Sequence, residues 1–301
     1  MSGMHRHRLK LRLKKTRISF QRTIQLLSAA LFNGYAAGFR KGRIFTGSSK
    51  AVCVPVLNCY SCPGALGACP IGALQEAVGG RRHFPFYALG LLMLSGILLG
   101  RAICGLLCPF GLVQDLIHNL PVPKRNLPAA LDRPARLLKY LILLIMVFLL
   151  PAFLVPETNV APPYFCKYLC PAGTLGGGIP LLLTTPALRQ AAGALFHWKL
   201  LVLLLILAAS ALIQRPFCRY LCPLGAFYAL FNRFSFYQMH LDSEKCTDCG
   251  ACERVCPMAV PVTLNISSPE CIRCGQCRGV CPSGAVSSGF SRTGQTGKQK
   301  T

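Results

Sequence analysis

The C-terminal part of the chain carries the same run of cysteines twice. Each run has the spacing C-x2-C-x2-C-x3-C-P, formed by Cys246, Cys249, Cys252 and Cys256 and then by Cys271, Cys274, Cys277 and Cys281. In chains with this pattern, three closely spaced thiolates bind one [4Fe–4S] cluster and the fourth thiolate binds the other cluster. A structural zinc site instead closes with four ligands. The duplicated run therefore predicts a module that holds two iron–sulfur clusters.

Because the fourth cysteine of each run binds the cluster of the other run, the pattern assigns every cysteine of this module to a cluster. We predict that the first cluster is bound by Cys246, Cys249, Cys252 and Cys281. We predict that the second cluster is bound by Cys271, Cys274, Cys277 and Cys256. The module covers residues 242–286, which are too few for an apolar core of their own, so the clusters would serve as its core. We expect an α+β two-cluster ferredoxin-like domain here, followed by a disordered tail over 287–301.

The rest of the chain is unusually apolar. Hydrophobic residues make up 52% of the sequence and charged residues only 14%, whereas soluble domains carry about 25% charged residues. Four apolar runs lie at 23–39, 84–100, 140–156 and 200–214. Their lengths are near the lower limit for a helix that crosses a bilayer. We therefore expect an all-α polytopic membrane domain over 23–241, with about four transmembrane helices.

The charge of the chain suggests how it is oriented. It has 33 Lys and Arg residues against 9 Asp and Glu residues, but they are spread along the chain, which argues against nucleic-acid binding. A basic arm over 1–22 precedes the first apolar run, and such segments stay on the cytoplasmic side. With four spans, both termini are predicted to be cytoplasmic, in the lipid of a bacterial-type inner membrane. The basic loop 40–83 conflicts with this rule.

The membrane domain contains a two-fold internal repeat of cysteine motifs. Three copies of C-x3-C-P-x-G begin at Cys104, Cys166 and Cys218, and a partial copy begins at Cys69. Two cysteines four residues apart lie on one face of a helix, one turn apart. The copies that follow the second and fourth apolar runs would meet on the same side of the membrane. They predict a four-thiolate metal site made by Cys104, Cys108, Cys218 and Cys222.

The same reasoning predicts a second site on the opposite side. Cys166 and Cys170 are expected to meet two cysteines of the preceding loop, which offers Cys53, Cys59, Cys62 and Cys69. We select the last two, so the predicted ligands are Cys62, Cys69, Cys166 and Cys170. Two other interpretations stay open, namely small buried thiols and disulfides in an oxidising compartment. The expected cofactors are two [4Fe–4S] clusters in the C-terminal module and one or two further iron–sulfur clusters.

Apolar spans interrupted by C-x3-C-P motifs and followed by a two-cluster module resemble the NapH/MauN-like 4Fe–4S membrane proteins. NosR and CcoG share parts of the pattern. The resemblance covers residues 20–285, but the cysteine-rich loop 52–74 and the Cys166/Cys170 pair depart from it. It implies electron transfer between the quinone pool, or another membrane donor, and a redox protein partner, as in a subunit of a quinol dehydrogenase.

Two other functions are consistent with the same motifs. An assembly or maturation factor would use the clusters to reduce a metal or a disulfide in another protein. A redox-sensing regulator would use them to report oxidation to a partner. The sequence has no C-x-x-C-H motif, which excludes covalently bound c-type haem. It also assigns no catalytic residue.

Overall fold

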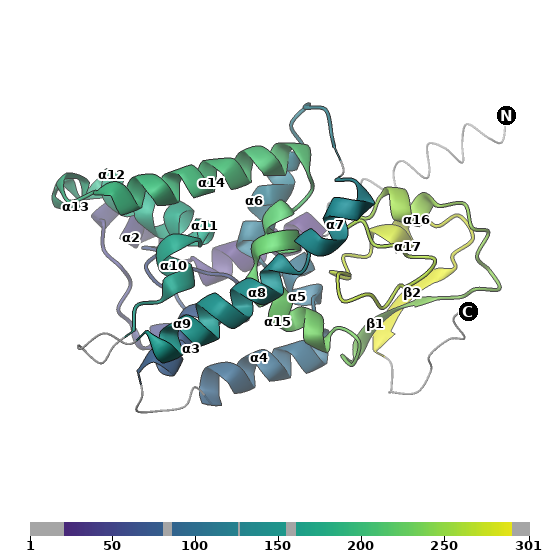
Figure 1. Ribbon diagram of the computed structural model, residues 1–301, viewed down its shortest axis with the longest axis horizontal. Coiled ribbons are helices and arrows are strands. Elements are labelled where there is room, and N and C mark those ends of the chain that lie inside the picture. Colours follow the sequence, from purple (N-terminus) through teal and green to yellow (C-terminus); the bar gives the residue numbers. More distant parts are fainter. Residues whose placement is uncertain (1–20, 81–85, 126, 155–160, 291–301) are drawn as a thin grey trace.

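The computed structural model of the chain describes residues 21–80, 86–125, 127–154 and 161–290. Figure 1 shows a large helical part and, at one end of the long axis, a small part that contains the only strands among these residues. The two parts share one continuous apolar core, which runs from Cys53 in the helical part to Ile272 in the small part. The structure is mostly helical with two strands at one end, and the predicted domain boundaries stay a prediction.

The first half of the helical part begins with a helix over residues 21–32. It continues with α2 (Ala36–Lys41), the short 3-10 helix η1 (Ser48–Ala51), α3 (Pro70–Gly79), α4 (Phe86–Leu99), α5 (Ala102–Leu106), α6 (Pro109–His118) and α7 (Ala129–Ala135). The second half contains α8 (Leu138–Ile142), η2 (Leu143–Leu149), α9 (Leu150–Phe153), α10 (Tyr164–Tyr168), α11 (Pro171–Gly173), η3 (Thr174–Gly178), α12 (Ile179–Thr184), α13 (Pro186–Gln190), α14 (Ala194–Leu212), η4 (Phe217–Leu221) and α15 (Pro223–Phe231).

Four helices start at a Cys-Pro dipeptide. Cys69, Cys108, Cys170 and Cys222 precede α3, α6, α11 and α15, and each has extended backbone angles. The proline that follows each of them occupies the first helical turn, where its missing N–H costs nothing. Each Cys-Pro dipeptide therefore places a thiol at the N-terminal end of a helix.

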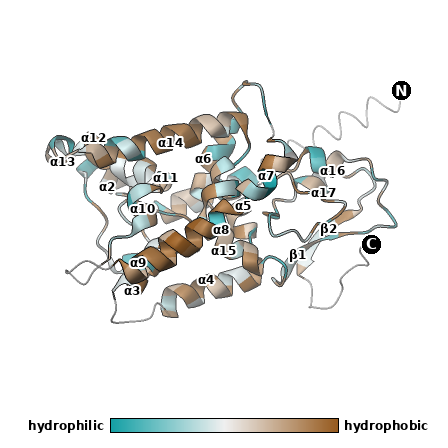
Figure 2. Cartoon of the chain, in the orientation of Figure 1, coloured by the Kyte–Doolittle hydropathy of each residue, from teal (hydrophilic) through white to brown (hydrophobic). Residues whose placement is uncertain are grey.

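Two helical segments of the described residues are long and apolar enough to cross a membrane. They are Ala130–Phe153 and Ala194–Leu212, and the predicted spans 140–156 and 200–214 fall on them. Most of their side chains face outward, and large apolar ones such as Leu144 and Leu204 are exposed. Figure 2 shows strongly hydrophobic residues along α8, α9 and α14. Such a surface is what a helix in contact with lipid presents.

The other two predicted spans differ from these. The helix α4 is apolar but has 14 residues, and the start of the predicted span 84–100 lies outside the described residues. The predicted span 23–39 is not one helix, because the chain bends between residue 32 and Ala36. At this bend Leu66 donates a backbone hydrogen bond to Phe32, and Tyr35 donates one to Gly64. The cysteine-rich loop therefore occupies the place where the helix would have continued. Four spans stay a prediction.

The small part contains a two-stranded antiparallel sheet of β1 (Tyr237–Leu241) and β2 (Val286–Phe290). Two short helices, α16 (Ala251–Arg254) and α17 (Gln276–Val280), lie inside the cysteine runs. Residues 287–290 were assigned to the tail above, but they form most of β2, because Tyr237 and Phe290 pair at the end of the ladder. The rest of the predicted tail and the basic arm up to residue 20 lie outside the described residues.

Candidate iron–sulfur sites

The C-terminal module brings the predicted ligands of the second cluster together. Cys256, Cys271, Cys274 and Cys277 line one cavity. The thiols of Cys271 and Cys277 both interact electrostatically with that of Cys256, which comes from the other cysteine run. Burial raises the pKa of the Cys277 thiol to about 12. An all-thiolate donor set around a closed space fits a [4Fe–4S] cluster.

The predicted ligands of the first cluster lie nearer the surface of the module. Cys252 is buried and interacts electrostatically with Cys246, whereas Cys249 is exposed. The Sγ atom of Cys281 lies 3.5 Å from Oγ of Ser283. Hydrogen bonds from Ser283, Val286 and Ala285 outweigh the effect of burial and lower the pKa of Cys281. The complete ligand set of this cluster stays a prediction.

Four thiols of the helical part lie together in its core. Cys104 comes from α5, Cys218 from η4, and Cys108 and Cys222 from the ends that precede α6 and α15. All four are buried, and the Cys222 thiol interacts electrostatically with the other three. Burial raises the pKa of Cys104 to about 11, so iron must displace its proton. These four residues are the first predicted membrane-domain site, which we call the arginine-flanked thiols.

The arginine-flanked thiols are so called because two buried arginines lie beside them. Arg101 and Arg215 each stand three residues before a cysteine of the set, Cys104 and Cys218. Each reaches across to the other motif: Arg101 donates to the carbonyl oxygen of Cys218 at 3.1 Å, and Arg215 donates to that of Cys104 at 2.9 Å. Both side chains are almost fully buried. Their charges face a site that becomes anionic when four thiolates bind a cluster.

The contact of each arginine with the opposite motif also explains the glycine in C-x3-C-P-x-G. A Cβ atom on Gly225 would stand 3.3 Å from the carbonyl oxygen of Cys218 and 3.4 Å from the guanidinium of Arg101. A Cβ atom on Gly111 would meet the oxygen of Cys104 at 3.3 Å and Arg215 at 3.5 Å. The contacts with the two carbonyl oxygens are tight, and those with the arginines are ordinary van der Waals contacts, so glycine leaves room around the oxygen that accepts each arginine's hydrogen bond.

A second group of thiols lies around α10 and α11. Cys59, Cys69 and Cys166 each interact electrostatically with the thiol of Cys170, and Cys69 also interacts with Cys59 and Cys166. A Cβ atom on Gly173 would stand 3.6 Å from Sγ of Cys59 and 3.9 Å from Sγ of Cys170. We call Cys59, Cys69, Cys166 and Cys170 the loop-side thiols.

The fourth member of this group is Cys59 and not Cys62, which the sequence had predicted. The backbone N–H of Cys62 donates to the carbonyl oxygen of Cys59 at 3.1 Å, which closes a turn between the two residues. The turn directs Sγ of Cys62 toward Oδ1 of Asn33, at 3.6 Å. Sequence spacing does not reveal the direction of such a turn.

Two glutamines were missed by the sequence analysis. Gln114 donates to Sγ of Cys218 at 3.1 Å and accepts the backbone N–H of Phe217 at 3.1 Å. Gln75 makes the same pair of contacts, with Sγ of Cys166 at 3.4 Å and the N–H of Phe165 at 2.9 Å. Both glutamines are fully buried and stand six residues after a Cys-Pro cysteine. The extended motif C-P-x-G-x-x-Q would have revealed them.

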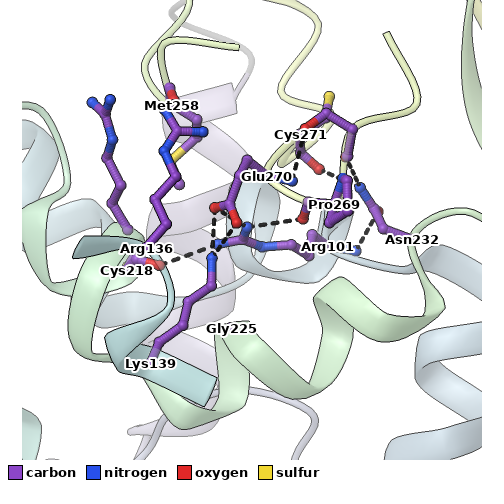
Figure 3. A network of polar contacts seen from close by, with 12 residues as sticks. Arg101, Arg136, Lys139, Cys218, Gly225, Asn232, Met258, Pro269, Glu270 and Cys271 are labelled. Atoms are coloured by element: carbon purple, nitrogen blue, oxygen red, sulfur yellow. Dashed lines mark hydrogen bonds and ion pairs between the residues drawn. The ribbon is translucent and has the colours of Figure 1, made fainter. Parts of the chain in front are cut away.

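A polar network joins the arginine-flanked thiols to the C-terminal module (Figure 3). Arg101 forms an ion pair with Glu270 at 2.9 Å and donates to the carbonyl oxygen of Pro269 at 3.0 Å. Lys139 forms a second ion pair with Glu270, at 2.5 Å. Opposing the effect of burial, Arg101 and Lys139 lower the pKa of Glu270. Because Glu270 precedes Cys271, the network holds the predicted second cluster site against the helical part.

The chemistry of these groups is that of thiolate clusters. Among the described residues, no group of three or more His, Cys, Asp or Glu side chains converges on a point where a single metal ion could bind. A four-iron cube is wider than one ion, so its thiolates stand further apart. All 18 cysteines lie in the described part of the chain, and none of them forms a disulfide.

Comparison with known families agrees with this chemistry. A family model described as a 4Fe-4S binding domain matches residues 67–87, 86–128, 139–182 and 195–238. Two further models with the same description match residues 237–258 and 265–287. No solved structure matches the chain.

Several curated proteins are similar to part of the chain. An uncharacterised protein of Methanocaldococcus jannaschii is 29% identical over 178 residues, which are 58% of this chain and 66% of that protein. YccM of Escherichia coli, a candidate electron transport protein, is 32% identical over 55% of this chain and 44% of its own length. The methylamine utilization ferredoxin-type protein MauN of Paracoccus denitrificans is 32% identical over 52% of this chain and 48% of its own length. The matched region thus spans between about two fifths and two thirds of these relatives.

Together, the cysteine sites and these matches define a ferredoxin-type 4Fe–4S protein. The chain belongs to the proteins built from 4Fe-4S binding domains, and its similarity to MauN agrees with the predicted resemblance to the NapH/MauN-like proteins.

Proposed function

We propose that the chain is a membrane-bound relay that passes electrons between a membrane donor, the quinone pool first of all, and a redox protein partner. One [4Fe–4S] cluster would be bound by the arginine-flanked thiols. The second cluster would be bound by Cys271, Cys274, Cys277 and Cys256, and the first by Cys246, Cys249, Cys252 and Cys281. The names of the similar proteins YccM and MauN, which refer to electron transport and to a ferredoxin type, support this function.

The observation that carries the proposal is the close contact between the arginine-flanked thiols and the second cluster site. Gly105 follows Cys104, and a Cβ atom on it would stand 2.3 Å from the carbonyl oxygen of Ile272. Ile272 lies between Cys271 and Cys274 in the sequence. Backbone that carries ligands of one site therefore touches backbone that carries ligands of the next. Two clusters in these places are close enough to exchange electrons.

An apolar groove beside the arginine-flanked thiols supports a quinone as the donor. It is lined by Ile24, Leu99, Ile103, Leu107, Tyr237 and Phe290. Ile103 and Leu107 each precede a cysteine of the set. An apolar groove with a few polar groups at its rim is the usual form of a site for an apolar ligand. A quinol held there would lie next to the predicted cluster.

The topology proposed for this relay is that of a multi-pass inner-membrane protein. Its four spans would bring both termini and the C-terminal module to the cytoplasmic side, as the basic arm indicates. The exposed side of the module, where Cys249 lies, is then available to a soluble redox partner. Electrons would leave the chain there, since the first cluster is the one nearer that surface.

The electron count of the relay is balanced by one-electron steps. Oxidation of one quinol to quinone releases two electrons and two protons, and the cluster sites would each accept and pass on one electron at a time. The two protons would leave to water at the membrane surface. The electrons would pass from the arginine-flanked site to the second cluster site, then to the first, and finally to the partner.

The experiment that tests the proposal is reduction of the anaerobically purified chain by a short-chain quinol, followed by electron paramagnetic resonance. The double variant C104S/C218S removes two arginine-flanked thiols. We expect quinol to reduce the ferredoxin-module clusters at least ten times more slowly in this variant, while dithionite still reduces them. The matched control is Cys53→Ser, which removes a buried thiol that belongs to neither group.

Two results would contradict the relay. The first is quinol reduction at an equal rate in the wild type and in C104S/C218S, which would show that electrons enter elsewhere. The second is stoichiometric loss of a cluster on oxidation without any turnover, which would favour a redox-sensing regulator.

A further inference from the structure

The fold brings the loop-side thiols together from four separate segments. Their Sγ atoms come from the loop after η1, the start of α3, α10 and the start of α11. Gly173 lies against two of them, since a Cβ atom there would stand 3.6 Å from Sγ of Cys59 and 3.9 Å from Sγ of Cys170. Cys69 and Cys170 are buried. The donor set is again four thiols.

The residues that surround the loop-side thiols are arranged like those that surround the arginine-flanked thiols. In both groups a Cys-Pro dipeptide starts a helix, and six residues later a buried glutamine bonds to a thiol of the other motif. Gln75 contacts Cys166 and the N–H of Phe165, as Gln114 contacts Cys218 and the N–H of Phe217. Such glutamines orient a ligand by a hydrogen bond from outside the ligand set. The two groups of thiols are therefore equivalent positions of the internal repeat.

The two groups are also close to each other. The backbone N–H of Leu57 donates a hydrogen bond to the thiol of Cys108. Cys59, a loop-side thiol, is two residues further along, and two residues of extended chain span at most about 7 Å. The hydroxyl group of Tyr228 interacts with thiols of both groups, Cys104 and Cys69, and donates to the carbonyl oxygen of Pro55 at 2.8 Å. The cysteine-rich loop thus enters the core and brings the loop-side thiols near the arginine-flanked thiols.

We propose that Cys59, Cys69, Cys166 and Cys170 bind an additional [4Fe–4S] cluster, which exchanges single electrons with the cluster of the arginine-flanked thiols. This inference rests on the proposed function, because it extends the relay by one member. Each exchange moves one electron from one cluster to the other and transfers no proton. The chain would then hold four clusters in a row, and Cys59 replaces Cys62 as the fourth ligand of the added one.

The test is a count of iron and acid-labile sulfide in the anaerobically reconstituted full chain, with electron paramagnetic resonance during reductive titration. For the wild type we expect about sixteen irons and as many sulfides per chain, as four cubes require. Cys59→Ser should lose about four irons and one resonance signal, with the other signals retained, which shows that the chain is folded. Cys62→Ser, three residues away in the same loop, is the matched control and should keep all of them.

Three results would overturn the added cluster. They are about twelve irons or fewer in the wild type, loss of iron in Cys62→Ser but not in Cys59→Ser, and a disulfide between two loop-side thiols found by mass spectrometry after alkylation. The experiment distinguishes failure of the proposed relay from failure of the proposed additional cluster. Twelve irons with rapid quinol reduction would leave the relay intact without the added cluster, whereas sixteen irons with no quinol reduction would leave the cluster without the relay.

Discussion

The arginine-flanked and loop-side thiols share a frame but differ in their charged surroundings. The first group lies between Arg101 and Arg215, both almost fully buried. The second group has Lys50 and Lys199 in electrostatic contact with Cys59, and Nζ of Lys50 is held by the carbonyl oxygen of Ala65 at 2.8 Å. Buried cations stabilise the more negative, reduced form of a cluster, and net charge is one of the factors that set its reduction potential. The repeat thus surrounds two similar groups of thiols with different cations, two arginines in one and two lysines in the other, and clusters bound there would differ in reduction potential.

The two groups also differ in what they contact. The arginine-flanked thiols are joined to the C-terminal module through Glu270 and through the close approach of Gly105 to Ile272. The loop-side thiols have no such connection to the module among the described residues. In the proposed relay, only the first group would therefore pass electrons directly to the ferredoxin-type clusters.

We expect the largest effect from a substitution that disrupts the contact between Gly105 and Ile272. In Gly105→Ala the added Cβ atom would overlap the carbonyl oxygen of Ile272, which is 2.3 Å away, so the backbone of one of the two sites must move. We expect electron transfer to the module clusters to slow at least tenfold with the iron content unchanged. The measurement is stopped-flow reduction by quinol. Gly72→Ala is the control, because its Cβ atom would meet nothing closer than Cβ of Cys69, at 4.0 Å. Equal rates in the two variants would contradict the contact.

The next effect concerns the ion pairs of Glu270. Glu270→Gln leaves Arg101 and Lys139 buried without a carboxylate, and the loss of one partner from a buried pair costs roughly 3–5 kcal/mol. We expect a fall of about 3 kcal/mol in the free energy of unfolding of the module, followed by loss of cluster absorption in urea. Asp242→Asn removes the exposed ion pair with Lys245 and should change nothing measurable. A wild-type transition in Glu270→Gln would show that the network does not hold the module in place.

A smaller effect tests the difference in charge between the two groups. Arg215→Gln removes a cation beside Cys104 and Cys218, so the reduction potential of that cluster should fall. The expected shift is on the order of 60–120 mV, as estimated for a unit charge near 6 Å at an effective dielectric constant of about 20. Arg215→Lys keeps the charge and should shift the potential less. A redox titration that moves the loop-side signal instead would reverse our assignment of the two sites.

The smallest effect separates the two halves of the repeat. Gln114→Leu removes the hydrogen bond to Sγ of Cys218, and Gln75→Leu removes the one to Sγ of Cys166. Hydrogen bonds to cluster sulfurs raise the reduction potential, so each variant should lower one potential by roughly 20–60 mV. Each should leave the other signal unmoved. If both variants shifted the same signal, the two groups would not be separate sites.

The sequence by itself determined the local part of each site. The spacing of the cysteine runs predicts a module with two clusters, and the structure brings Cys256 to the three thiols of the other run. Each Cys-Pro dipeptide predicts the start of a helix, since proline fits the first turn, and the structure shows four such starts. Apolar runs likewise predicted the two long apolar helices. The cysteine spacing, the Cys-Pro helix starts and the apolar runs are all patterns of residues that are consecutive or closely spaced in the chain.

Only the tertiary structure decided which distant residues meet. In the structure, the thiol of Cys59 lies beside that of Cys170, and Arg101 donates a hydrogen bond to the carbonyl oxygen of Cys218. The backbone N–H of Leu57 donates to the thiol of Cys108. The tertiary structure also ended the first helix early, because the cysteine-rich loop takes over the backbone groups at the bend. These contacts depend on the directions of turns and on the packing of one motif against another. Periodicity along a chain does not encode those directions, because a turn of a few residues can direct a thiol into the core or away from it.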